Sequence, residues 1–483
     1  MKQKTRFATT LLALTLSVGA LSACSGNGNN APGNSPSNSP GTSPSASSEA
    51  PAAKDTITAL LPPVSPKYQE NFKQMEADFN KLYPNLTLKI EPASWEDMTQ
   101  KLDTQVNAGS PPDLAFTNSE SIAKYAALGM MMDIKEHLTP EMVADFDEIP
   151  YGYMTKEGAQ YGLPAYLAVH SIGGNKQFLE EAGIDYKKVQ QSGWTYDEFR
   201  EAIKKGVVKE GDATKRYGFV FATAGVASKD YLGILVKGAG MPYPFTEDNK
   251  YAYTDEKYLT VLKSIRELID DGSMPKELGS IDAGKRWNMF LTGQTMITGK
   301  GLAVFENSAN TNNKKIEAND GSAVADSIKA EYIVLPMPSF AGQPAVSHAV
   351  VDGYVAFRGK KEPTAEHAAN VAKAAYFLAS GQVAATTNTD LFLSHITDSA
   401  RKAAEGVDTG RNPDNIAADE ALLKQAPPAR EIPTDLAADA IKLENEVIIP
   451  KLQALLAGEI TPEEMFEAVK KAAVDTFGAD GVV

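Results

Sequence analysis

Cysteine is almost absent from this sequence, which has one cysteine, Cys24, among its 483 residues. A single cysteine excludes an internal disulfide framework and a cysteine-rich metal site. Histidine is also scarce, because the five histidines are scattered and no two lie four residues apart. We therefore expect neither a metal site nor a cofactor. Residues 408–414 alternate oxygen-bearing side chains but lack the glycine and glutamate of a calcium-binding loop, so calcium binding is left open.

Basic residues are fewer than acidic residues, because the chain has 47 lysines and arginines and 62 aspartates and glutamates. Its formal net charge is −15. This balance argues against a nucleic-acid partner and against a membrane face recruited by charge. It does not separate an enzyme from a binding protein. The length predicts two or three domain-sized units, and no apolar run is long enough to span a membrane as a mature helix.

The first 24 residues have the features of an exported protein. Lys2, Lys4 and Arg6 precede a short apolar stretch over 7–21, and residues 21–24 read LSAC. This tetrapeptide resembles the lipobox of bacterial lipoproteins. The resemblance implies a signal peptide over 1–23 and a lipid anchor on Cys24, with a plain secretory signal as the alternative. Loss of residues 1–23, which hold three basic and no acidic residues, would leave a net charge of −18.

Residues 25–48 contain only Ser, Gly, Asn, Pro, Thr and Ala. Such a composition cannot bury apolar surface, so we predict a disordered linker over 24–54. A coil of about 30 residues has a root-mean-square reach of roughly 30 Å. The linker would therefore hold a folded body away from a membrane.

From Asp55 the sequence alternates strand and helix patterns. Strands are predicted at 56–61, 86–90 and 113–116, and the apolar residues of the first intervening helix recur at helical spacing. Ser94 has the position of a helix N-cap. Repeated strand–helix steps predict an α/β fold with mainly parallel sheets flanked by helices.

The same alternation returns after residues 161–184, which we interpret as the passage from one lobe to another. Thr195 with Glu198, and Thr461 with Glu464, have the spacing of capping boxes. Residues 307–319 are polar and are predicted to form a loop. Trp194, directly before a capping threonine, is interpreted as a structural residue.

Catalytic motifs are not found. The sequence contains no GxSxG elbow, no HExxH helix and no phosphate-binding loop of the GxxxxGK[ST] type. A catalytic pair of carboxylates stays open, because acidic residues are plentiful and sequence spacing alone cannot pair them.

Several short motifs occur in an order that resembles a known family. They are DLAF at 113–116 after GSPP, YGLP at 161–164 followed by NK at 175–176 and AG at 182–183, GWTYDEF at 193–199, FLTGQTM at 290–296, and AG at 457–458 before TPEE at 461–464. Together they resemble the extracellular solute-binding proteins of bacterial ABC importers, in particular the sugar-binding group that includes maltose-binding proteins. The resemblance covers residues 56–477.

This resemblance implies a two-lobed periplasmic-binding-protein-like fold of type II with three crossings between the lobes. The first lobe would comprise 55–167 and 336–388, and the second 168–335 and 389–483. A carbohydrate, expected to be an oligosaccharide, would be captured by hinge closure and passed to the permease subunits of an ABC transporter. The implied protein is a monomer held by lipid at the extracellular face of the cell membrane. A secreted glycoside hydrolase, and a sensor or chaperone on the same fold, are the alternatives.

A sugar needs planar hydrogen-bonding groups for its hydroxyls and aromatic rings for its apolar faces, offered by loops at the carboxyl ends of strands. The candidate ligand contacts are Tyr68, Trp95, Asn118, Ser119, Glu120, Tyr166, Tyr231, Trp287, Lys300, His348 and Asp352. Asn118 and Ser119 could instead cap a helix, Tyr166 could pack at the hinge, and Lys300 could be a surface residue. Maltose-type proteins carry a tryptophan near the position of Lys300, so the particular sugar is not identified.

Overall fold

The computed structural model describes residues 54–65, 67–224, 227–427 and 430–483. The predicted signal peptide, Cys24 and all of the linker except Lys54 lie outside these residues. Among the described residues, no helix is both long enough and apolar enough to cross a membrane. The chain from Ala53 to Val483 forms one unit, in which two large bodies share a mixed sheet.

The first body is built on three parallel strands, β1 (Asp55–Leu61), β2 (Leu86–Pro92) and β3 (Leu114–Asn118). Helices α1 (Tyr68–Leu82) and α2 (Trp95–Ala108) connect them. The predicted cap is confirmed, because the Ser94 side chain accepts a hydrogen bond from the Asp97 amide. The strand–helix alternation thus folds as the sequence pattern predicts, with one apolar face of each element on a common core.

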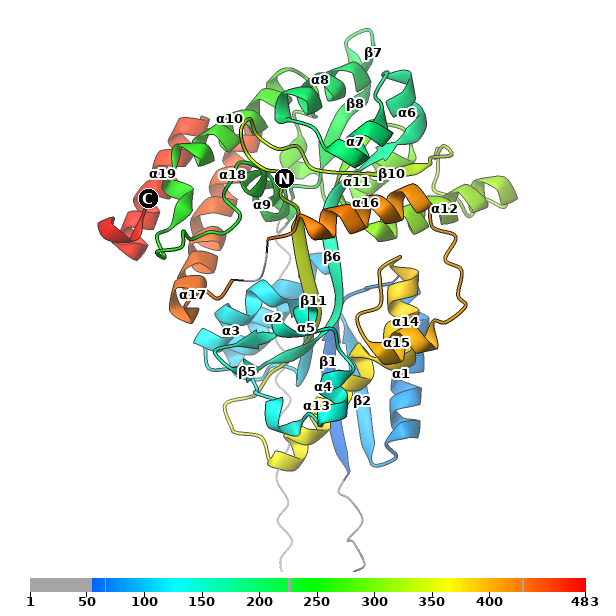
Figure 1. Cartoon of the computed structure of the whole chain (residues 1–483), viewed down its shortest axis with the longest axis vertical. Helices are drawn as coiled ribbons and strands as arrows, with labels where there is room; N and C mark the ends of the chain where they lie inside the picture. Colours follow the sequence, from blue (N-terminus) through cyan, green and yellow to red (C-terminus); the bar gives the residue numbers. More distant parts are fainter. Residues whose placement is uncertain (1–53, 66, 225–226, 428–429) are drawn as a thin grey trace, which may run out of the picture. The chain divides into compact units, whose positions relative to one another are not determined.

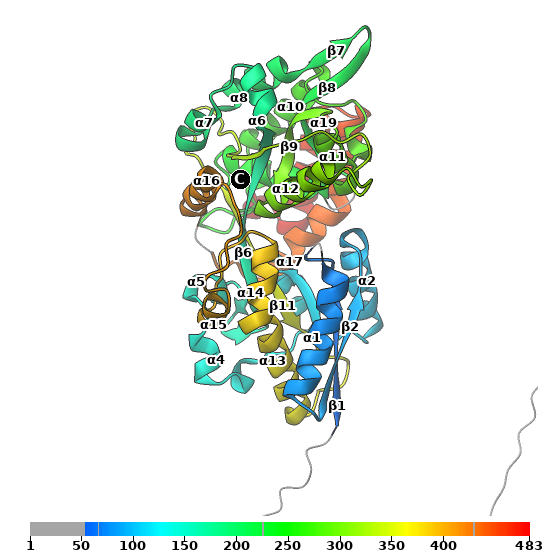
Figure 2. The same cartoon turned by 90° about the vertical axis from the view of Figure 1, so that its right-hand side faces the viewer.

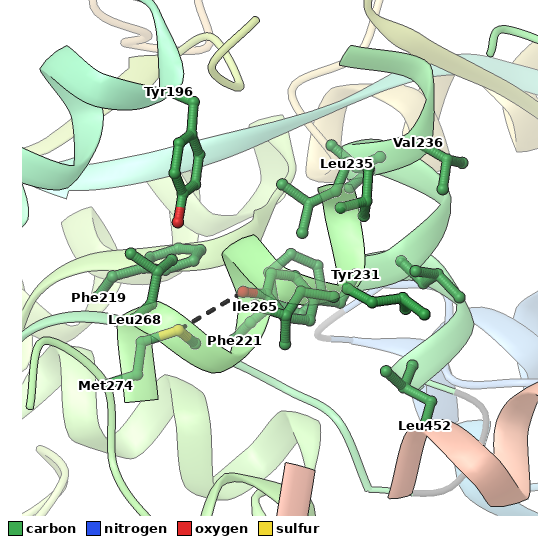
Figure 3. Packing of buried hydrophobic residues seen from close by; sticks show 14 of the residues in the cluster. Tyr196, Phe219, Phe221, Tyr231, Leu235, Val236, Ile265, Leu268, Met274 and Leu452 are labelled. Atoms are coloured by element: carbon green, nitrogen blue, oxygen red, sulfur yellow. Dashed lines mark hydrogen bonds between the residues drawn. The ribbon is translucent and has the colours of Figure 1, made fainter. Parts of the chain in front are cut away.

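The second body holds the parallel pair β8 (Ala213–Phe221) and β9 (Thr295–Gly301). Helix α8 (Tyr196–Gly206) and helix α19 (Pro462–Phe477) both begin with the predicted capping boxes. These helices and α10 (Glu256–Asp270) bury their apolar faces in one large core, part of which Figure 3 shows. Trp194 is confirmed as structural, because it is buried and donates a hydrogen bond to the Pro336 carbonyl.

Two long strands run from one body to the other. β6 (Gly162–Asn175) and β11 (His348–Ala356) pair antiparallel along most of their length, and they lie side by side between the bodies in Figure 1. The sheet order is β2-β1-β3-β11-β6-β9-β8-β7. The prediction of mainly parallel sheets therefore holds for β1 to β3 and for β8 with β9, whereas every pair that involves β6 or β11 is antiparallel.

Figures 1 and 2 show the remaining elements, of which β7 and β10 belong to the large sheet, β4 and β5 form a separate hairpin, and the helices pack around the strands. They are α3 (Ile122–Ala127), α4 (Pro140–Ala144), α5 (Glu148–Gly152), β4 (Thr155–Lys156), β5 (Ala159–Gln160), α6 (Lys176–Glu181), α7 (Tyr186–Ser192), β7 (Val208–Glu210), α9 (Ala227–Gly238), α11 (Ala283–Leu291), α12 (Ala303–Ala318), β10 (Tyr332–Leu335), α13 (Ala365–Ala379), α14 (Gly381–Asp390), α15 (Asp398–Ala403), α16 (Pro413–Lys424), α17 (Thr434–Leu443) and α18 (Ile449–Ala457).

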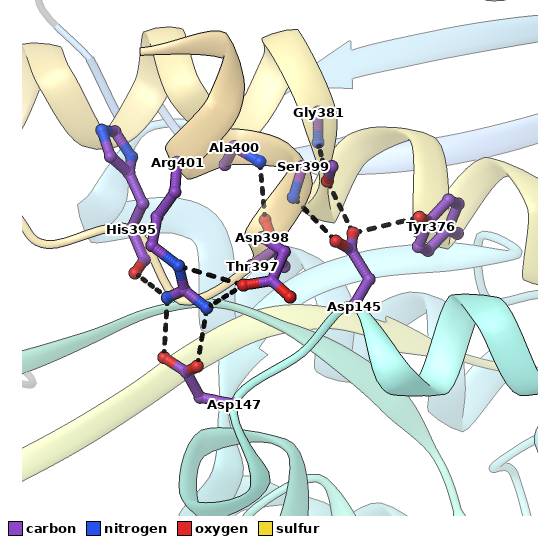
Figure 4. A network of polar contacts seen from close by, with 10 residues as sticks. All are labelled: Asp145, Asp147, Tyr376, Gly381, His395, Thr397, Asp398, Ser399, Ala400 and Arg401. Atoms are coloured by element: carbon purple, nitrogen blue, oxygen red, sulfur yellow. Dashed lines mark hydrogen bonds and ion pairs between the residues drawn. The ribbon is translucent and has the colours of Figure 1, made fainter. Parts of the chain in front are cut away.

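Helix α15, which follows the boundary expected at residue 388, contacts the first body. Asp145, which follows α4, accepts hydrogen bonds from the amide and hydroxyl of Ser399 on α15. Asp147 forms an ion pair with Arg401 from the same helix. Figure 4 shows this network, and it ties α15 to the segment between α4 and α5.

The polar stretch predicted as a loop is helical. Residues 307–319 lie in α12 and at its C-cap, so the prediction is wrong. The side chains of Asn312 and Asn313 are hydrogen-bonded to the segment 324–330, which packs on the helix. A helix face that binds a neighbouring backbone through amide side chains does not show the apolar periodicity from which helices are predicted.

Candidate functional site

A cleft of about 560 Å³ lies between the two bodies, with residues of both among its walls. The first wall comes from the start of the segment after β3, from the end of α5 and from the β4–β5 hairpin. The second wall comes from α9, from the loops after it and from α17. The residues that matter below are Ser119, Glu120, Tyr153, Lys156 and Glu157 on the first wall, Lys229, Asp230, Lys237, Tyr243, Tyr253, Arg430 and Glu444 on the second, and His348 between them.

Glu120 is the main charged group of the first wall. It follows β3 in a short 3-10 turn over Ser119–Ser121, which Asn118 caps by accepting hydrogen bonds from the amide and hydroxyl of Ser121. The Glu120 side chain keeps 59% exposure, and its Oε1 lies 3.6 Å from His348 Nε2. Burial opposes ionisation, but the His348 contact and the charges of Lys237 and Lys229 outweigh it and lower the pKa of Glu120. Glu120 is thus an ionised acceptor open to the cleft.

Several charged side chains of the second wall form shorter contacts with the protein than Glu120 does. Asp230, on α9, pairs with Lys300 of β9 at 3.0 Å, and both side chains are about one quarter exposed. Lys237 Nζ donates to the Pro242 carbonyl at 2.9 Å, and burial lowers the pKa of Lys237. Arg430 donates to the carbonyls of Phe245 and Thr246. These cations are therefore already committed to the protein's own oxygens.

Glu444 and Lys229 complete the second wall. Burial raises the pKa of Glu444, although the charge of Lys229 partly offsets this effect. Burial lowers the pKa of Lys229, but Glu444, Asp230 and Glu120 outweigh burial and raise it. The cleft therefore presents carboxyl groups of both walls around Lys229, which suits a ligand that offers hydroxyl donors.

Tyrosines supply the aromatic surface of the cleft. Tyr153 stands on the first wall, and Tyr243 and Tyr253 stand on the second. The Tyr253 ring stacks on Tyr258 at 5.1 Å, and the Arg430 guanidinium lies over the Tyr243 ring. Rings fixed in this way offer flat apolar surface next to polar groups, which is the combination that sugars require.

The floor of the cleft is formed by His348 and Ala349 of β11, the strand that pairs with β6. His170 and His348 are cross-strand partners, and their rings are 4.8 Å apart between centroids. Burial lowers the pKa of both imidazoles. Further along the strands, the Tyr166 hydroxyl donates to Asp352 at 2.7 Å. Both contacts link β6 to β11 where these strands pass between the bodies.

The two walls also touch at one side of the cleft. Lys156 in the β4–β5 hairpin donates to the Ile432 carbonyl, and the Thr434 hydroxyl donates to the carboxylate of Glu157. Helix α17 packs against α3 nearby. The hairpin and the start of α17 therefore form a direct contact between the walls.

The structure brings three of the predicted contacts into the cleft, namely Ser119, Glu120 and His348. Lys300 reaches Asp230, which lines the cleft, and Asp352 binds Tyr166 on β6. Asn118 performs the capping role that was its alternative interpretation. Glu120 therefore stands out as the predicted contact with the clearest access to a ligand.

Other predicted contacts lie elsewhere. Tyr231 is fully buried in the second core, where its hydroxyl contacts Met274 Sδ (Figure 3), so its assignment as a ligand contact is corrected. Other residues of the same helix, α9, line the cleft, among them Lys229, Asp230 and Lys237. Trp287 stacks between Phe290 and Phe305. Trp95 donates to the Pro63 carbonyl, and Tyr68 packs on Phe72.

Sequence reasoning missed most of the second wall. Lys229 and Asp230 lie next to the predicted Tyr231, but the face of α9 that points to the cleft could not be told from the sequence. Glu444 lies in a π-helical turn over Glu444–Ile448 between α17 and α18, and no motif in the sequence singled it out. Tyr153, Tyr243 and Tyr253 provide aromatic surface in the cleft, whereas the sequence reasoning had expected tryptophans to do so.

A family model described as bacterial extracellular solute-binding protein matches residues 61–385. The match spans more than half of the 483 residues. The chain belongs to the bacterial extracellular solute-binding proteins. This family assignment confirms the resemblance that the motifs indicated.

Known relatives of this solute-binding protein are distant. A Brucella abortus protein that bears the name of a binding protein is 24% identical over 253 residues, which are 52% of this chain and 58% of that protein. An arabinooligosaccharide-binding protein of Halalkalibacterium halodurans is 24% identical over 204 residues, 41% of this chain and 42% of that one. The match thus spans 58% of the first of these curated relatives and 42% of the second.

A solved structure shows that the fold is shared. An ABC substrate-binding protein from Listeria monocytogenes in complex with cycloalternan superposes with a TM-score of 0.67 at 18% identity, covering 88% of this chain and 99% of that one. The likeness confirms the two-lobed binding-protein fold. None of the relatives named here is described as a hydrolase.

Proposed function

We propose that this solute-binding protein captures a carbohydrate, an oligosaccharide, in the cleft between its lobes and presents it to the permease of an ABC transporter. The observation that carries the proposal is the cleft itself, where tyrosine rings and open carboxylates from two bodies face one space. Family membership supports the transport role. The relatives that bind arabinooligosaccharide and cycloalternan support an oligosaccharide as the ligand.

Hinge closure would couple binding to delivery. The first lobe would comprise 55–167 and 336–388, extended through α15 by its packing, and the second lobe the remainder of the folded chain. A ligand that contacts both walls favours the closed arrangement over the open one. β6 and β11, together with the segment between α15 and α16, would form the three crossings.

Attachment through lipid on Cys24 completes the proposal. The LSAC sequence and the following polar segment support a protein held at the outer face of the cell membrane. We also propose that the protein acts as a monomer. A Cys24→Ser variant would then be released into the medium, whereas the native protein would stay with the membrane fraction. Equal distribution of the two proteins would remove the anchor from the proposal without affecting the ligand.

Isothermal titration calorimetry with neutral oligosaccharides of several linkages tests the ligand class. We expect one class to bind and, at a hundredfold excess over Kd, to stabilise the protein by about 2.7 kcal/mol. Chromatography of the sugar after incubation provides the control. Cleavage of the sugar would favour a hydrolase, and the absence of binding by any saccharide would overturn the carbohydrate assignment.

A further inference from the structure

His348 and His170 are buried histidines whose rings have unsatisfied nitrogens. His348 on β11 lines the cleft and is 8% exposed, and neither its Nδ1 nor its Nε2 has a hydrogen-bond partner among the described residues. Nδ1 of His170, its cross-strand partner, also lacks one in this part of the chain. Buried polar atoms are almost always hydrogen-bonded. The His348 imidazole therefore borders the cleft with its hydrogen-bonding capacity unused.

Glu120 is the acidic side chain that His348 can reach. Its Oε1 lies 3.6 Å from His348 Nε2, slightly too far for a hydrogen bond, and its side chain is 59% exposed. Because an exposed side chain is free to rotate, Glu120 can move toward the ring or away from it. With a proton on both nitrogens, the imidazole would hold the carboxylate by ionic attraction as well as by a hydrogen bond. The contact is therefore weak while the ring is neutral and strong once the ring is charged.

Charged side chains of three other elements act on the two imidazoles. They are Glu120 from the turn after β3, Lys229, Asp230 and Lys237 from α9, and Lys300 from β9. The three lysines oppose a positive charge on His170, and Lys237 also opposes one on His348, whereas Glu120 and Asp230 favour it there. Burial is the largest influence and lowers the pKa of both imidazoles. Both rings are therefore neutral at pH 7 and gain a proton only in acidic solution.

We infer that His348 is a positioning residue, which leaves Glu120 open to the ligand while its ring is neutral and pairs with Glu120 once its ring is protonated, so that acid weakens ligand binding. The inference rests on the proposed function, because it concerns the same cleft. A ligand hydroxyl and the protonated ring compete for the Glu120 carboxylate. A ligand also displaces water from the cleft, and loss of water disfavours a charged imidazole. Binding in acidic solution therefore releases the proton of His348 to the buffer.

Calorimetric titration at pH 7.5 and at pH 5.0 tests this coupling, with maltotriose, cellotriose, xylotriose and arabinotriose as the panel. These saccharides do not titrate in this range, so any released proton comes from the protein. For a saccharide that binds at pH 7.5, we expect the affinity to fall roughly threefold or more at pH 5.0. Buffers with different ionisation enthalpies should show that binding releases protons at pH 5.0.

The outcomes separate this inference from the proposed function. An affinity that is equal at the two pH values, without proton release, would overturn the inference and leave carbohydrate binding in place. A higher affinity at pH 5.0 would overturn it as well. If no saccharide of the panel binds at pH 7.5, the proposed function falls and the inference falls with it.

Variants separate the pair of His348 and Glu120 from other effects of acid. His348→Gln, which cannot gain a proton, should lose both the proton release and the fall in affinity at pH 5.0. Glu120→Gln should lose both as well, which keeps the test available if His348→Gln fails to fold. His395→Gln is the matched control, because burial and Arg401 also lower the pKa of His395, which lies beside α15 and not in the cleft (Figure 4). A pH dependence that keeps its full size in His348→Gln, or that disappears in His395→Gln, would contradict the inference.

Discussion

The two walls of the cleft hold their carboxylates in different ways. Glu120 on the first wall lies 3.6 Å from an imidazole, that of His348, whereas Asp230 on the second wall lies 3.0 Å from the ammonium of Lys300. An imidazole changes its charge near neutral pH, and an ammonium does not. The first wall therefore offers an open and pH-sensitive acceptor, while on the second wall Asp230 is held in an ion pair with an ammonium. We expect ligand affinity to depend mainly on Glu120 and local stability mainly on Lys300.

The largest effect is expected from Glu120→Gln, which keeps the shape of the side chain and removes its charge. Loss of charged hydrogen bonds to ligand hydroxyls should weaken binding roughly 10- to 100-fold. Calorimetric titration of the bound saccharide measures the change. Glu431→Gln is the matched control on the exposed rim of the cleft, and an equal loss in both variants would contradict the special place of Glu120.

Lys300→Met tests the second wall. Asp230 would lose its partner while three quarters buried, and the free energy of unfolding should fall by about 1–2 kcal/mol. Lys329→Met provides the comparison, because Lys329 pairs with Glu317 where both side chains are 59% exposed, and surface pairs contribute little. Urea unfolding measures both variants. Similar losses of stability in the two variants would mean that the Asp230–Lys300 pair contributes no more than a surface pair.

The pH dependence of stability should separate the walls further. Burial lowers the pKa of His170 and His348 from 6.5. Below pH 6.5 the unfolded chain therefore binds protons more readily than the folded protein, and both histidines lower the free energy of unfolding as the pH falls. His367, between Asp55 and Asp113, has a raised pKa because these carboxylates outweigh its burial. Its contribution is present below pH 6.5 and is lost as the pH rises through its raised pKa.

Urea unfolding across a pH series checks these opposite signs. His348→Gln should lessen the loss of stability on acidification, and His367→Gln should make that loss greater. Lys300→Met should lower the stability at every pH, and it should change the slope between pH 5 and 7 only through His170, whose pKa the charge of Lys300 helps to lower. A slope that is the same in His348→Gln and in the native protein would contradict the assignment of the first wall as the pH-sensitive one.

The smallest effect is expected where the walls touch. Thr434→Val removes the hydrogen bond to Glu157, which joins the β4–β5 hairpin to the start of α17. The contact is exposed, so we expect dissociation of the ligand to become less than ~threefold faster, with an unchanged association rate. Stopped-flow fluorescence measures both rates. A change as large as that of Glu120→Gln would mean that this contact controls closure.

Much of the fold could be predicted because its elements have local signatures. Apolar spacing placed β1, α1 and β3, and capping residues placed the starts of α2, α8 and α19. The direction of the crossing strands could not be predicted, because β6 is buried along nearly its whole length and its sequence shows no regular alternation of apolar and polar residues. Helix α12 was missed because its amide side chains bind backbone instead of presenting an apolar face.

The site could be predicted only in part, for a similar reason. Glu120 follows a recognisable strand, so its place at the carboxyl end of β3 was readable from the sequence. Tyr231 was misplaced, because the sequence of α9 does not tell which of its faces meets the cleft and which meets the core. Glu444 depends on the approach of α17 to the first wall, a contact between segments far apart in the sequence.

The central claim is that one saccharide bridges both walls and closes the cleft. The most direct measurement is the distance between spin labels on two exposed residues, Lys73→Cys on α1 and Lys257→Cys on α10, in a Cys24→Ser background, during titration with the saccharide that binds in calorimetry. We predict that the distance shortens on saturation and that the sugar is recovered intact. In Glu120→Gln, the same sugar concentrations should leave the distance unchanged. A distance that stays constant while the sugar binds would contradict the account.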